Sequence, residues 1–347
     1  MSTRRIVKLD DRGQLQVVEE PTPKLQPYTI LVEVKSCLLS PGTELEGIIS
    51  RRKKPSDSGK MYPIGYANAG VVTDVGEGCK GVKKGMRVAC IGGGDASHAS
   101  HVLMPINLTT PMPDGQSFDE AAFAHLAATA LNAVRRSEIQ FGQNVLVVGL
   151  GLVGQIASQI AKVCGTHVMV SDRLPIRLEK AREFGVDLAI DPTKEKLVEK
   201  AKAFTRGYGL DVAIIAFGGD ATELMKEIVT SMKLAPDGHN MGVITIVGGA
   251  QFTGLFPVPF GNIDVRASSR PGPGYHDKEW ERGRDYPPVF VEWNTRRNME
   301  ECLRFAAEGA LKLEPLITHR LPLEKAAQGY QELIDNPNKT LGVILNP

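Results

Sequence analysis

Residues 144–154, NVLVVGLGLVG, join an apolar run to three closely spaced glycines and decide the fold of the middle of the chain. The apolar run is typical of a buried strand, and the residues that follow have helical periodicity. Gly149, Gly151 and Gly154 thus form a GxGxxG motif between a strand and a helix, which predicts a turn that binds the pyrophosphate of a dinucleotide. Gly149 permits the tight turn, Gly151 lets the backbone approach the phosphates, and Gly154 allows the helix to pack closely on the strand.

The segments around this motif alternate between strand-like and helix-like patterns. Such alternation predicts a parallel sheet covered by helices, which is a doubly wound α/β fold. The helix after the glycines would offer its free N–H groups and its positive dipole end to the phosphates. The predicted elements are strands at 144–149, 166–172, 211–217 and 242–248, and helices at 152–165 and 177–185.

Asp172 ends the second predicted strand, where a carboxylate is expected to accept hydrogen bonds from the adenosine ribose. Because such a carboxylate also repels a 2′-phosphate, Asp172 favours NAD(H) over NADP(H). Arg173 could accept that phosphate, but next to Asp172 we expect it to flank the adenine. Further residues expected to contact the cofactor are Thr129, Leu152, Val153, Arg177, Phe217, Val247 and Gly248.

The two ends of the chain have other patterns. Alternating or apolar stretches bounded by Gly and Pro predict strands at 29–40 and 66–76, whereas the basic segment 51–60 is predicted to be a surface loop. The remaining predicted elements are a helix at 118–136, a long loop rich in Gly, Pro and charge at 269–293, an amphipathic helix at 298–311 and a strand at 340–345.

Composition excludes several classes of protein. A chain of 347 residues suffices for two domains, and its net charge of +1 gives no bias toward nucleic acid or an acidic membrane surface. No apolar run reaches the length of a membrane span, and the charged start MSTRRIVKLDDRG lacks the apolar core of a secretory signal. The five cysteines are scattered without a CxxC pair, which favours a reducing cytoplasm.

Five segments together resemble one family over nearly the whole chain: GYANAGVVTDVGEGCKGVKKGMRVA (65–89), FAHLAATALNAV (123–134), GLGLVGQIASQIAK (149–162), SDRLPIRLEKAREFGVD (171–187) and LITHRLPLEKAAQGYQEL (316–333). The chain resembles the medium-chain dehydrogenase/reductase superfamily, which includes alcohol and polyol dehydrogenases. The resemblance implies a GroES-like β-barrel catalytic domain at 1–118 and 294–347, a Rossmann domain at 119–293, and an active site in the cleft where the nicotinamide meets the catalytic domain. We also expect a homodimer or homotetramer.

The chain departs from this family at the positions of the catalytic zinc. Zinc-dependent members carry a Cys, then a His–Glu pair, then a third ligand. Here Ser40 replaces the Cys and Tyr66 replaces the His, and the third position falls at or near His125. One imidazole with a serine and a tyrosine is a poor zinc site. The four-cysteine zinc lobe of the family is also missing, and we interpret His98 and His101 as ordinary polar residues rather than ligands. The sequence therefore predicts no metal.

Without zinc, side chains must handle the alcohol proton or the developing oxyanion. Tyr66 and His125 occupy ligand-equivalent positions, so both are expected to point toward the reacting oxygen. Alternatively, Tyr66 only fills the space of the metal and His125 is a core histidine with its hydrogen bonds satisfied. Thr43 and Glu44 resemble the hydroxyl–acid pair that follows the first ligand, and Thr43 could relay a proton.

The predicted loop 269–293 is a candidate for substrate binding, because long loops in compact domains tend to be functional. Arg270, Tyr275 and His276 are its polar candidates, and Ser40 is a further one. An oligomer contact or a solvated flap is an equally good interpretation of this loop.

These observations predict an NAD(H)-dependent, zinc-independent oxidoreductase that interconverts a polar secondary alcohol, of the sugar, cyclitol or polyol type, and its ketone. One alternative is an NAD(P)H-dependent quinone or enone C=C reductase, which also lacks zinc in this superfamily. The other alternative is a catalytically silent dinucleotide-binding protein.

Overall fold

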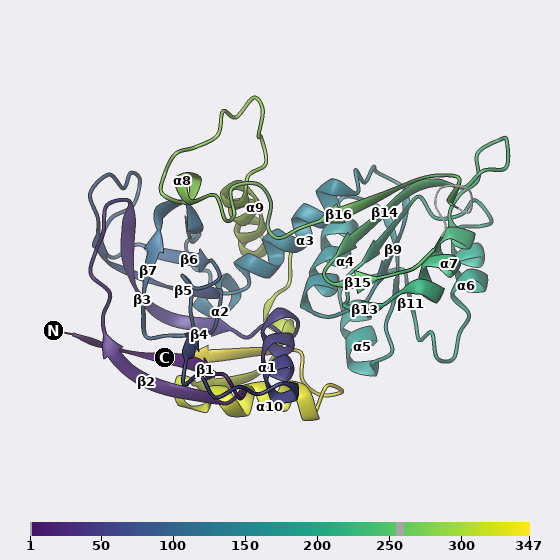
Figure 1. Cartoon of the computed structure of the whole chain (residues 1–347). Coiled ribbons are helices and arrows are strands. Elements are labelled where there is room, and N and C mark those ends of the chain that lie inside the picture. The colour runs from purple at the N-terminus through teal and green to yellow at the C-terminus, as the bar shows by residue number, and fades with distance from the viewer. Residues whose placement is uncertain (1, 255–259) are drawn as a thin grey trace. The chain divides into compact units, whose positions relative to one another are not determined.

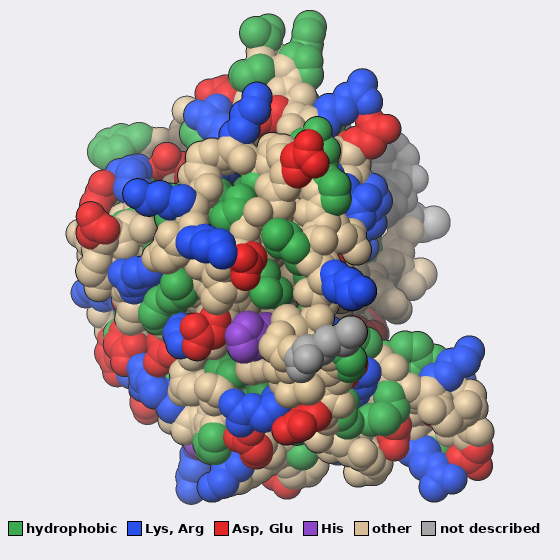
Figure 2. Space-filling model, turned by 90° about the vertical axis from the view of Figure 1, so that its left-hand side faces the viewer, with side chains coloured by type: hydrophobic (Ala, Val, Ile, Leu, Met, Phe, Trp, Pro, Cys, Tyr) green, Lys and Arg blue, Asp and Glu red, His purple; other side chains and the backbone are tan. Residues whose placement is uncertain are grey.

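The computed structural model describes residues 2–254 and 260–347, which fall into two compact units (Figure 1). The Rossmann unit is Thr129–Arg270, and the terminal unit joins Met1–Ala128 to Pro271–Pro347. Within the described ranges, no helix has the length and apolarity that a membrane span requires. Figure 2 shows acidic and basic side chains interspersed over one face, in keeping with the net charge of +1.

The Rossmann unit is built on a six-stranded sheet in the order β11-β10-β9-β12-β14-β16. Every pairing in this sheet is parallel, so the predicted doubly wound α/β fold is confirmed. Its elements are β9 (Asn144–Val148), α4 (Leu152–Val163), β10 (His167–Ser171), α5 (Pro175–Glu183), β11 (Leu188–Ile190), α6 (Leu197–Phe204), β12 (Val212–Ile215), α7 (Thr222–Ser231), β14 (Met241–Val247) and β16 (Asn262–Ser268), with β13 (Gly219–Asp220) and β15 (Ala250–Gln251) forming a small second sheet.

The order of the strands indicates where a ligand would bind to the Rossmann unit. In sequence order the six main strands read 3-2-1-4-5-6, so the order reverses between β9 and β12. Ligands of such sheets bind at the carboxyl ends of the strands, where the order reverses. Helices α6 and α7 pack on the sheet through a buried apolar cluster that includes Leu146, Leu197 and Met225.

The terminal unit contains a seven-stranded, mostly antiparallel sheet and a three-stranded antiparallel sheet. The larger sheet has the order β17-β18-β3-β5-β6-β8, with β7 also paired to β3, and the smaller has the order β2-β1-β4. The strands are β1 (Thr3–Asp10), β2 (Leu15–Pro21), β3 (Thr29–Leu38), β4 (Met61–Pro63), β5 (Ala67–Val75), β6 (Arg87–Ile91), β7 (His101–Pro105), β8 (Thr109–Pro111), β17 (Ile317–Pro322) and β18 (Gly342–Asn346). The helices are α1 (Thr43–Lys53), η1 (Ile106–Leu108), α2 (Phe118–Ala121), α8 (Lys278–Glu281), α9 (Thr295–Ala307), η3 (Glu314–Leu316), η4 (Leu323–Lys325) and α10 (Ala326–Asp335), while α3 (Ala124–Arg136) runs from this unit into the Rossmann unit.

The boundaries of the two units differ from the predicted ones. The terminal unit includes residues 119–128 and 271–293, which the sequence had assigned to the Rossmann domain. Asp119 accepts hydrogen bonds from Ser36 and from Arg320 of β17, which ties α2 to the larger sheet. Asn107 donates to the carbonyl oxygen of the fully buried Trp280 at 2.7 Å, which ties the second segment to the same unit.

Three predicted elements also need correction. Residues 51–53, predicted as part of a loop, form the last turn of α1, whose acidic first turn and basic last turn complement the helix dipole. The predicted loop 269–293 contains the short helix α8, which Asp277 caps by accepting hydrogen bonds from two backbone N–H groups. The predicted helix 118–136 is divided into α2 and α3.

The close packing of α4 on β9 predicts a sharp difference between two glycines of the motif. A Cβ on Gly154 would lie 1.9 Å from the carbonyl oxygen of Gly149, whereas a Cβ on Gly151 would have no atom within 4 Å. We expect Gly154→Ala to destabilise the Rossmann unit by about 1–3 kcal/mol, since overpacking forces the backbone to move. Urea unfolding of both variants measures this. Equal stability of Gly154→Ala and Gly151→Ala would contradict the packing described.

Candidate active site

The predicted site residues fall into two groups, one in each unit. Ser40, Tyr66 and His125 belong to the terminal unit, whereas the glycine motif and Asp172 belong to the Rossmann unit. The first group carries candidate acid–base side chains, and the second carries the features of a dinucleotide site.

Ser40 and Tyr66 meet because the end of β3 pairs with the start of β5. Cys37 lies opposite Asn68 in this antiparallel pair, so the residues just beyond the two strands lie at the same edge of the sheet. The Tyr66 hydroxyl donates a hydrogen bond to Ser40 Oγ. Burial, reinforced by the Glu44 carboxylate, raises the pKa of Tyr66 above its ordinary value, so the hydroxyl keeps its proton at neutral pH.

His125 lies against Tyr66 on one side and Tyr275 on the other. The centroids of the His125 and Tyr66 rings are 4.4 Å apart, and the Tyr275 ring meets His125 edge-on at 5.3 Å. The Tyr275 hydroxyl accepts a hydrogen bond from the N–H of Gly93 at 2.9 Å, and its ring is 4.2 Å from that of His276. The structure thus brings four predicted site residues, from the residue before β5, from α3 and from the segment before α8, into one cluster.

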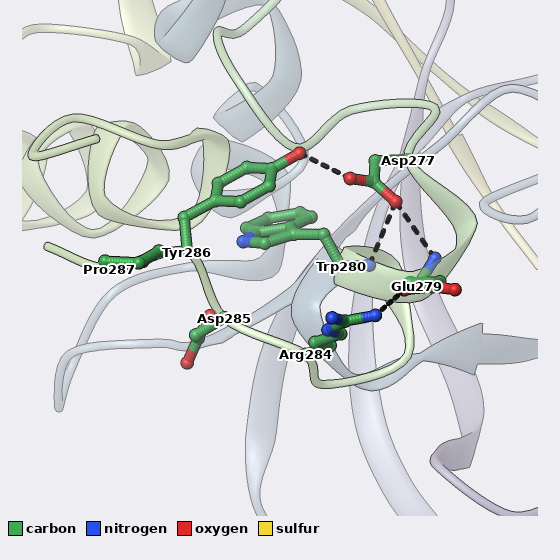
Figure 3. A pocket seen from close by; sticks show the side chains of 7 residues that line it. All are labelled: Asp277, Glu279, Trp280, Arg284, Asp285, Tyr286 and Pro287. Atoms are coloured by element: carbon green, nitrogen blue, oxygen red, sulfur yellow. Dashed lines mark hydrogen bonds and ion pairs between the residues drawn. The ribbon is translucent and has the colours of Figure 1, made fainter. Parts of the chain in front are cut away.

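The segment that carries Tyr275 is braced by its own contacts (Figure 3). Tyr286 donates to Asp277 at 2.6 Å, and the other oxygen of the same carboxylate accepts from the backbone N–H groups of Glu279 and Trp280. Arg284 pairs with Glu279 on the far side of α8. These residues also line a hollow of about 330 Å³. The described bracing favours a fixed platform for Tyr275 over the predicted alternative of a solvated flap.

Below Ser40 lies a buried polar cluster that the sequence did not reveal. The Glu44 Oε2 atom accepts hydrogen bonds from the Ser40 backbone N–H at 2.8 Å and from the Tyr330 hydroxyl at 2.7 Å. His98 Nε2 lies 3.4 Å from the same oxygen and 3.1 Å from the Tyr330 hydroxyl. Glu44 is 6% exposed, whereas His98 and Tyr330 are fully buried.

The charges in this cluster favour an ion pair between the Glu44 carboxylate and the His98 imidazole. Burial disfavours the charged imidazole, but the Glu44 carboxylate and the Cys37 side chain together outweigh burial and raise the pKa of His98 to about 10. The same carboxylate and burial raise the pKa of Tyr330 well above its ordinary value. His98 had been interpreted as an ordinary polar residue and Tyr330 was missed. Tyr330 lies on the apolar face of an amphipathic helix, and no local pattern marks a buried hydroxyl.

Two other predicted residues lie outside this buried cluster. Thr43 begins α1 and is exposed, but its hydroxyl is close enough to Tyr66 for a side-chain hydrogen bond that lowers the pKa of Tyr66, while its neighbour Glu44 points into the core. His101, at the start of β7, bonds to its neighbour Ser100 rather than joining His98. Within residues 2–254 and 260–347, no three His, Cys, Asp or Glu side chains are placed to hold a metal ion.

The residues at the family's zinc positions do not fit that metal. The donors there are the Ser40 hydroxyl, the Tyr66 phenol and one imidazole, whereas zinc prefers thiolate, imidazole and carboxylate ligands. The Tyr66 hydroxyl is protonated and directed at Ser40, so it is arranged as a hydrogen-bond donor and not as an anionic ligand.

The glycine motif fits the phosphates of a dinucleotide. Gly149 has φ +86°, which favours glycine, and α4 begins just after Gly151. The space beside Gly151 is open, so a phosphate can approach the backbone there. Leu152 is buried at the start of α4, and Val153 is half-buried beside it.

Asp172 follows β10 and is bound to the glycine loop itself. Its Oδ2 accepts from the N–H of Leu150 at 2.6 Å, and its Oδ1 accepts from the N–H of Leu174 at 2.9 Å. Arg177 Nη1 lies 3.3 Å from Oδ2, whereas the side chain of Arg173 is exposed. The carboxylate can accept further hydrogen bonds, since each oxygen has two lone pairs.

The remaining predicted residues follow strand ends or the unit boundary. Phe217 comes shortly after β12, and Val247 and Gly248 lie at the end of β14, so these three share the carboxyl edge of the sheet with the glycine motif. Thr129 lies on α3 at the start of the unit. Arg270, a predicted substrate residue, belongs to the Rossmann unit, whereas Tyr275 and His276 belong to the terminal unit.

Comparisons with known proteins agree with both units. The family model described as zinc-binding dehydrogenase matches residues 153–282. The chain is 25% identical to (R,R)-butanediol dehydrogenase of Neisseria gonorrhoeae, over 97% of this chain and 98% of that protein. It is 27% identical to sorbitol dehydrogenase of Mus musculus, over 92% of this chain and 89% of that protein. A solved structure from Sinorhizobium meliloti 1021, bound to NADP, superimposes with a TM-score of 0.79 at 22% identity over the full length of both chains, which shows a shared fold.

With this fold, the glycine motif at the sheet edge and full-length relatives that are dehydrogenases, the chain is an oxidoreductase that is similar to the zinc-type alcohol dehydrogenase-like group of the medium-chain dehydrogenase/reductase superfamily.

Proposed function

We propose that the chain is an NAD(H)-dependent, zinc-independent dehydrogenase that interconverts a polar secondary alcohol, of the sugar, cyclitol or polyol type, and its ketone. The observation that carries the proposal is the contact of the protonated Tyr66 hydroxyl with Ser40 and of its ring with His125. The resemblance to the family implies that these three side chains take the positions of the zinc ligands. The names of the relatives, butanediol and sorbitol dehydrogenase, support the substrate class.

Nicotinamide supplies the hydride chemistry, and the glycine loop with Asp172 would hold the dinucleotide. The protein must then manage one proton and the charge on the substrate oxygen. The Tyr66 hydroxyl is neutral and carries one proton, so to hydrogen-bond the reacting oxygen it would donate that proton to the substrate and accept from the Ser40 hydroxyl instead of donating to it. An imidazole has one ring nitrogen that can donate and one that can accept a proton, which suits His125 to exchange the proton. Tyr275 is placed to contact the substrate, because its ring packs against that of His125.

The first prediction concerns metal. Because two of the three ligand-equivalent positions hold Ser40 and Tyr66, the purified protein should contain far less than one zinc per chain. Elemental analysis after dialysis without a chelator measures this. Stoichiometric zinc would overturn the zinc-free part of the proposal and require another set of ligands.

The second prediction concerns the dinucleotide. NADH should bind more tightly than NADPH, because the Asp172 carboxylate accepts ribose hydrogen bonds and repels a 2′-phosphate. Gly151→Ala should fold normally but lose affinity for both, since its methyl group would fill the open space beside the loop. Fluorescence titration measures both effects. Equal or tighter binding of NADPH would favour the C=C reductase alternative.

The third prediction concerns the chemical step. Tyr66→Phe and His125→Ala should each slow hydride transfer, by about two to four orders of magnitude where the residue is the acid–base group, and leave NADH affinity unchanged. The measurement is single-turnover oxidation with NAD⁺ of the best alcohol from a panel containing 2,3-butanediol, sorbitol and inositol. A large loss in one variant alone assigns the proton to that residue.

Near-wild-type rates in both variants would show that Tyr66 and His125 only pack. A protein that reduces an enone with NADPH and oxidises no alcohol of the panel would contradict the proposed reaction. A protein that binds NADH and turns over neither class would be the catalytically silent alternative.

A further inference from the structure

The buried cluster of Glu44, His98 and Tyr330 contacts the neighbours of Tyr66 on two sides, the hydroxyl side and the backbone side. On the hydroxyl side, Glu44 Oε2 accepts the backbone N–H of Ser40, and Ser40 Oγ accepts the Tyr66 hydroxyl. Glu44 therefore fixes the loop that carries the partner of Tyr66.

On the backbone side, His98 packs under the residue that precedes Tyr66. Gly65 has φ +115°, and a Cβ there would lie 2.9 Å from two atoms of the His98 ring. The N–H of His98 also donates to the carbonyl oxygen of Ile64 at 2.9 Å. His98 therefore fixes the backbone from which the Tyr66 side chain extends.

Tyr330 closes the cluster from a distant part of the chain. Its hydroxyl donates to Glu44 at 2.7 Å and lies 3.1 Å from His98 Nε2, so it contacts both braces at once. Within the described residues, Glu44 Oε1 is buried and has no hydrogen-bond partner. A buried ion pair with an unsatisfied oxygen is a poor way to stabilise a fold, which points to a role other than stability.

We propose that Glu44, His98 and Tyr330 are positioning residues that hold the Tyr66 hydroxyl and its Ser40 partner in the geometry needed for the reaction. Glu44 then acts through Ser40 and does not touch the substrate, which differs from the direct catalytic role expected from the sequence. The inference rests on the proposed role of Tyr66, but the position of Tyr66 can be measured without any turnover.

The test uses the full chain with tyrosines labelled by ¹³C at Cζ, the carbon that bears the hydroxyl. The chain has seven tyrosines, so the spectrum is simple, and Tyr66→Phe and Tyr330→Phe assign the two signals. Tyr330→Phe keeps the buried ring and removes only the hydroxyl, so ring packing is preserved. We expect the Tyr66 signal to move in Tyr330→Phe and to move further in Glu44→Ala.

Two variants serve as controls. Glu44→Gln keeps a side-chain oxygen that can accept from Ser40 and Tyr330, so it should restore most of the wild-type Tyr66 signal. Thr109→Val removes another buried side-chain hydrogen bond of the same unit, the 2.7 Å bond from Thr109 to the carbonyl oxygen of Ile106, and should leave the Tyr66 signal in place. A fold-stabilising role alone predicts equal responses in Tyr330→Phe and Thr109→Val.

With an alcohol identified from the panel, Tyr330→Phe should lower kcat about 10- to 100-fold, as a misplaced catalytic group does, with KM and NADH affinity near wild type. An unmoved Tyr66 signal in Tyr330→Phe would overturn the inference, even if Glu44→Ala fails to fold. A moved Tyr66 signal together with an active Tyr66→Phe enzyme would instead contradict the proposed function and leave the positioning itself established.

Discussion

The carboxylate of Glu44 is the point on which the terminal unit's candidate site depends. It contacts the loop after β3, the loop before β7 and helix α10. Along the chain, His98 is 54 residues and Tyr330 is 286 residues from Glu44. A buried charge is tolerated only when it is paired and hydrogen-bonded, and removing one partner of such a pair typically costs about 3–5 kcal/mol. The three segments are therefore constrained to meet at this carboxylate, and the positions of Ser40 and Tyr66 follow from it.

In the proposed reaction, hydrogen bonds hold the side chains around the substrate oxygen, a task that a metal performs by coordination in zinc enzymes. A bound zinc ion fixes several side chains around one point and polarises the substrate oxygen. In the proposed site, Ser40, Tyr66 and His125 would take the corresponding positions, with Glu44 bonded to the Ser40 backbone and Tyr275 packed beside His125. A preorganised neutral donor can stabilise charge on the substrate oxygen without a cation, provided that it does not reorient during the reaction. A fixed Tyr66 is therefore a requirement of the proposed chemistry.

The sequence predicted the Rossmann unit well because its signals are local. The GxGxxG turn, the apolar strands and the helical periods lie within short windows, and their alternation predicts a parallel sheet. The unit boundaries were less accessible, because residues 271–293 have the composition of a loop and long-range contacts, such as those of Trp280 and Tyr275, tie them to the terminal unit. The cluster around Glu44 could not be predicted, since a buried polar residue has no periodic signature and its partners are distant in sequence.

Asp172 shows how the cofactor choice is tied to the shape of the phosphate loop. The same carboxylate that would meet the ribose also holds the N–H of Leu150, inside the glycine motif. Acceptance of a 2′-phosphate would favour a small neutral residue in place of Asp172. That replacement would leave the N–H of Leu150 without its partner and loosen the turn after β9. An unsatisfied buried N–H costs about 1–3 kcal/mol, so a change of cofactor would also weaken the site for the shared pyrophosphate. Under the proposed preference for NAD(H), the hydrogen bond from Leu150 to Asp172 therefore links the choice of dinucleotide to the shape of the glycine loop as well as to charge.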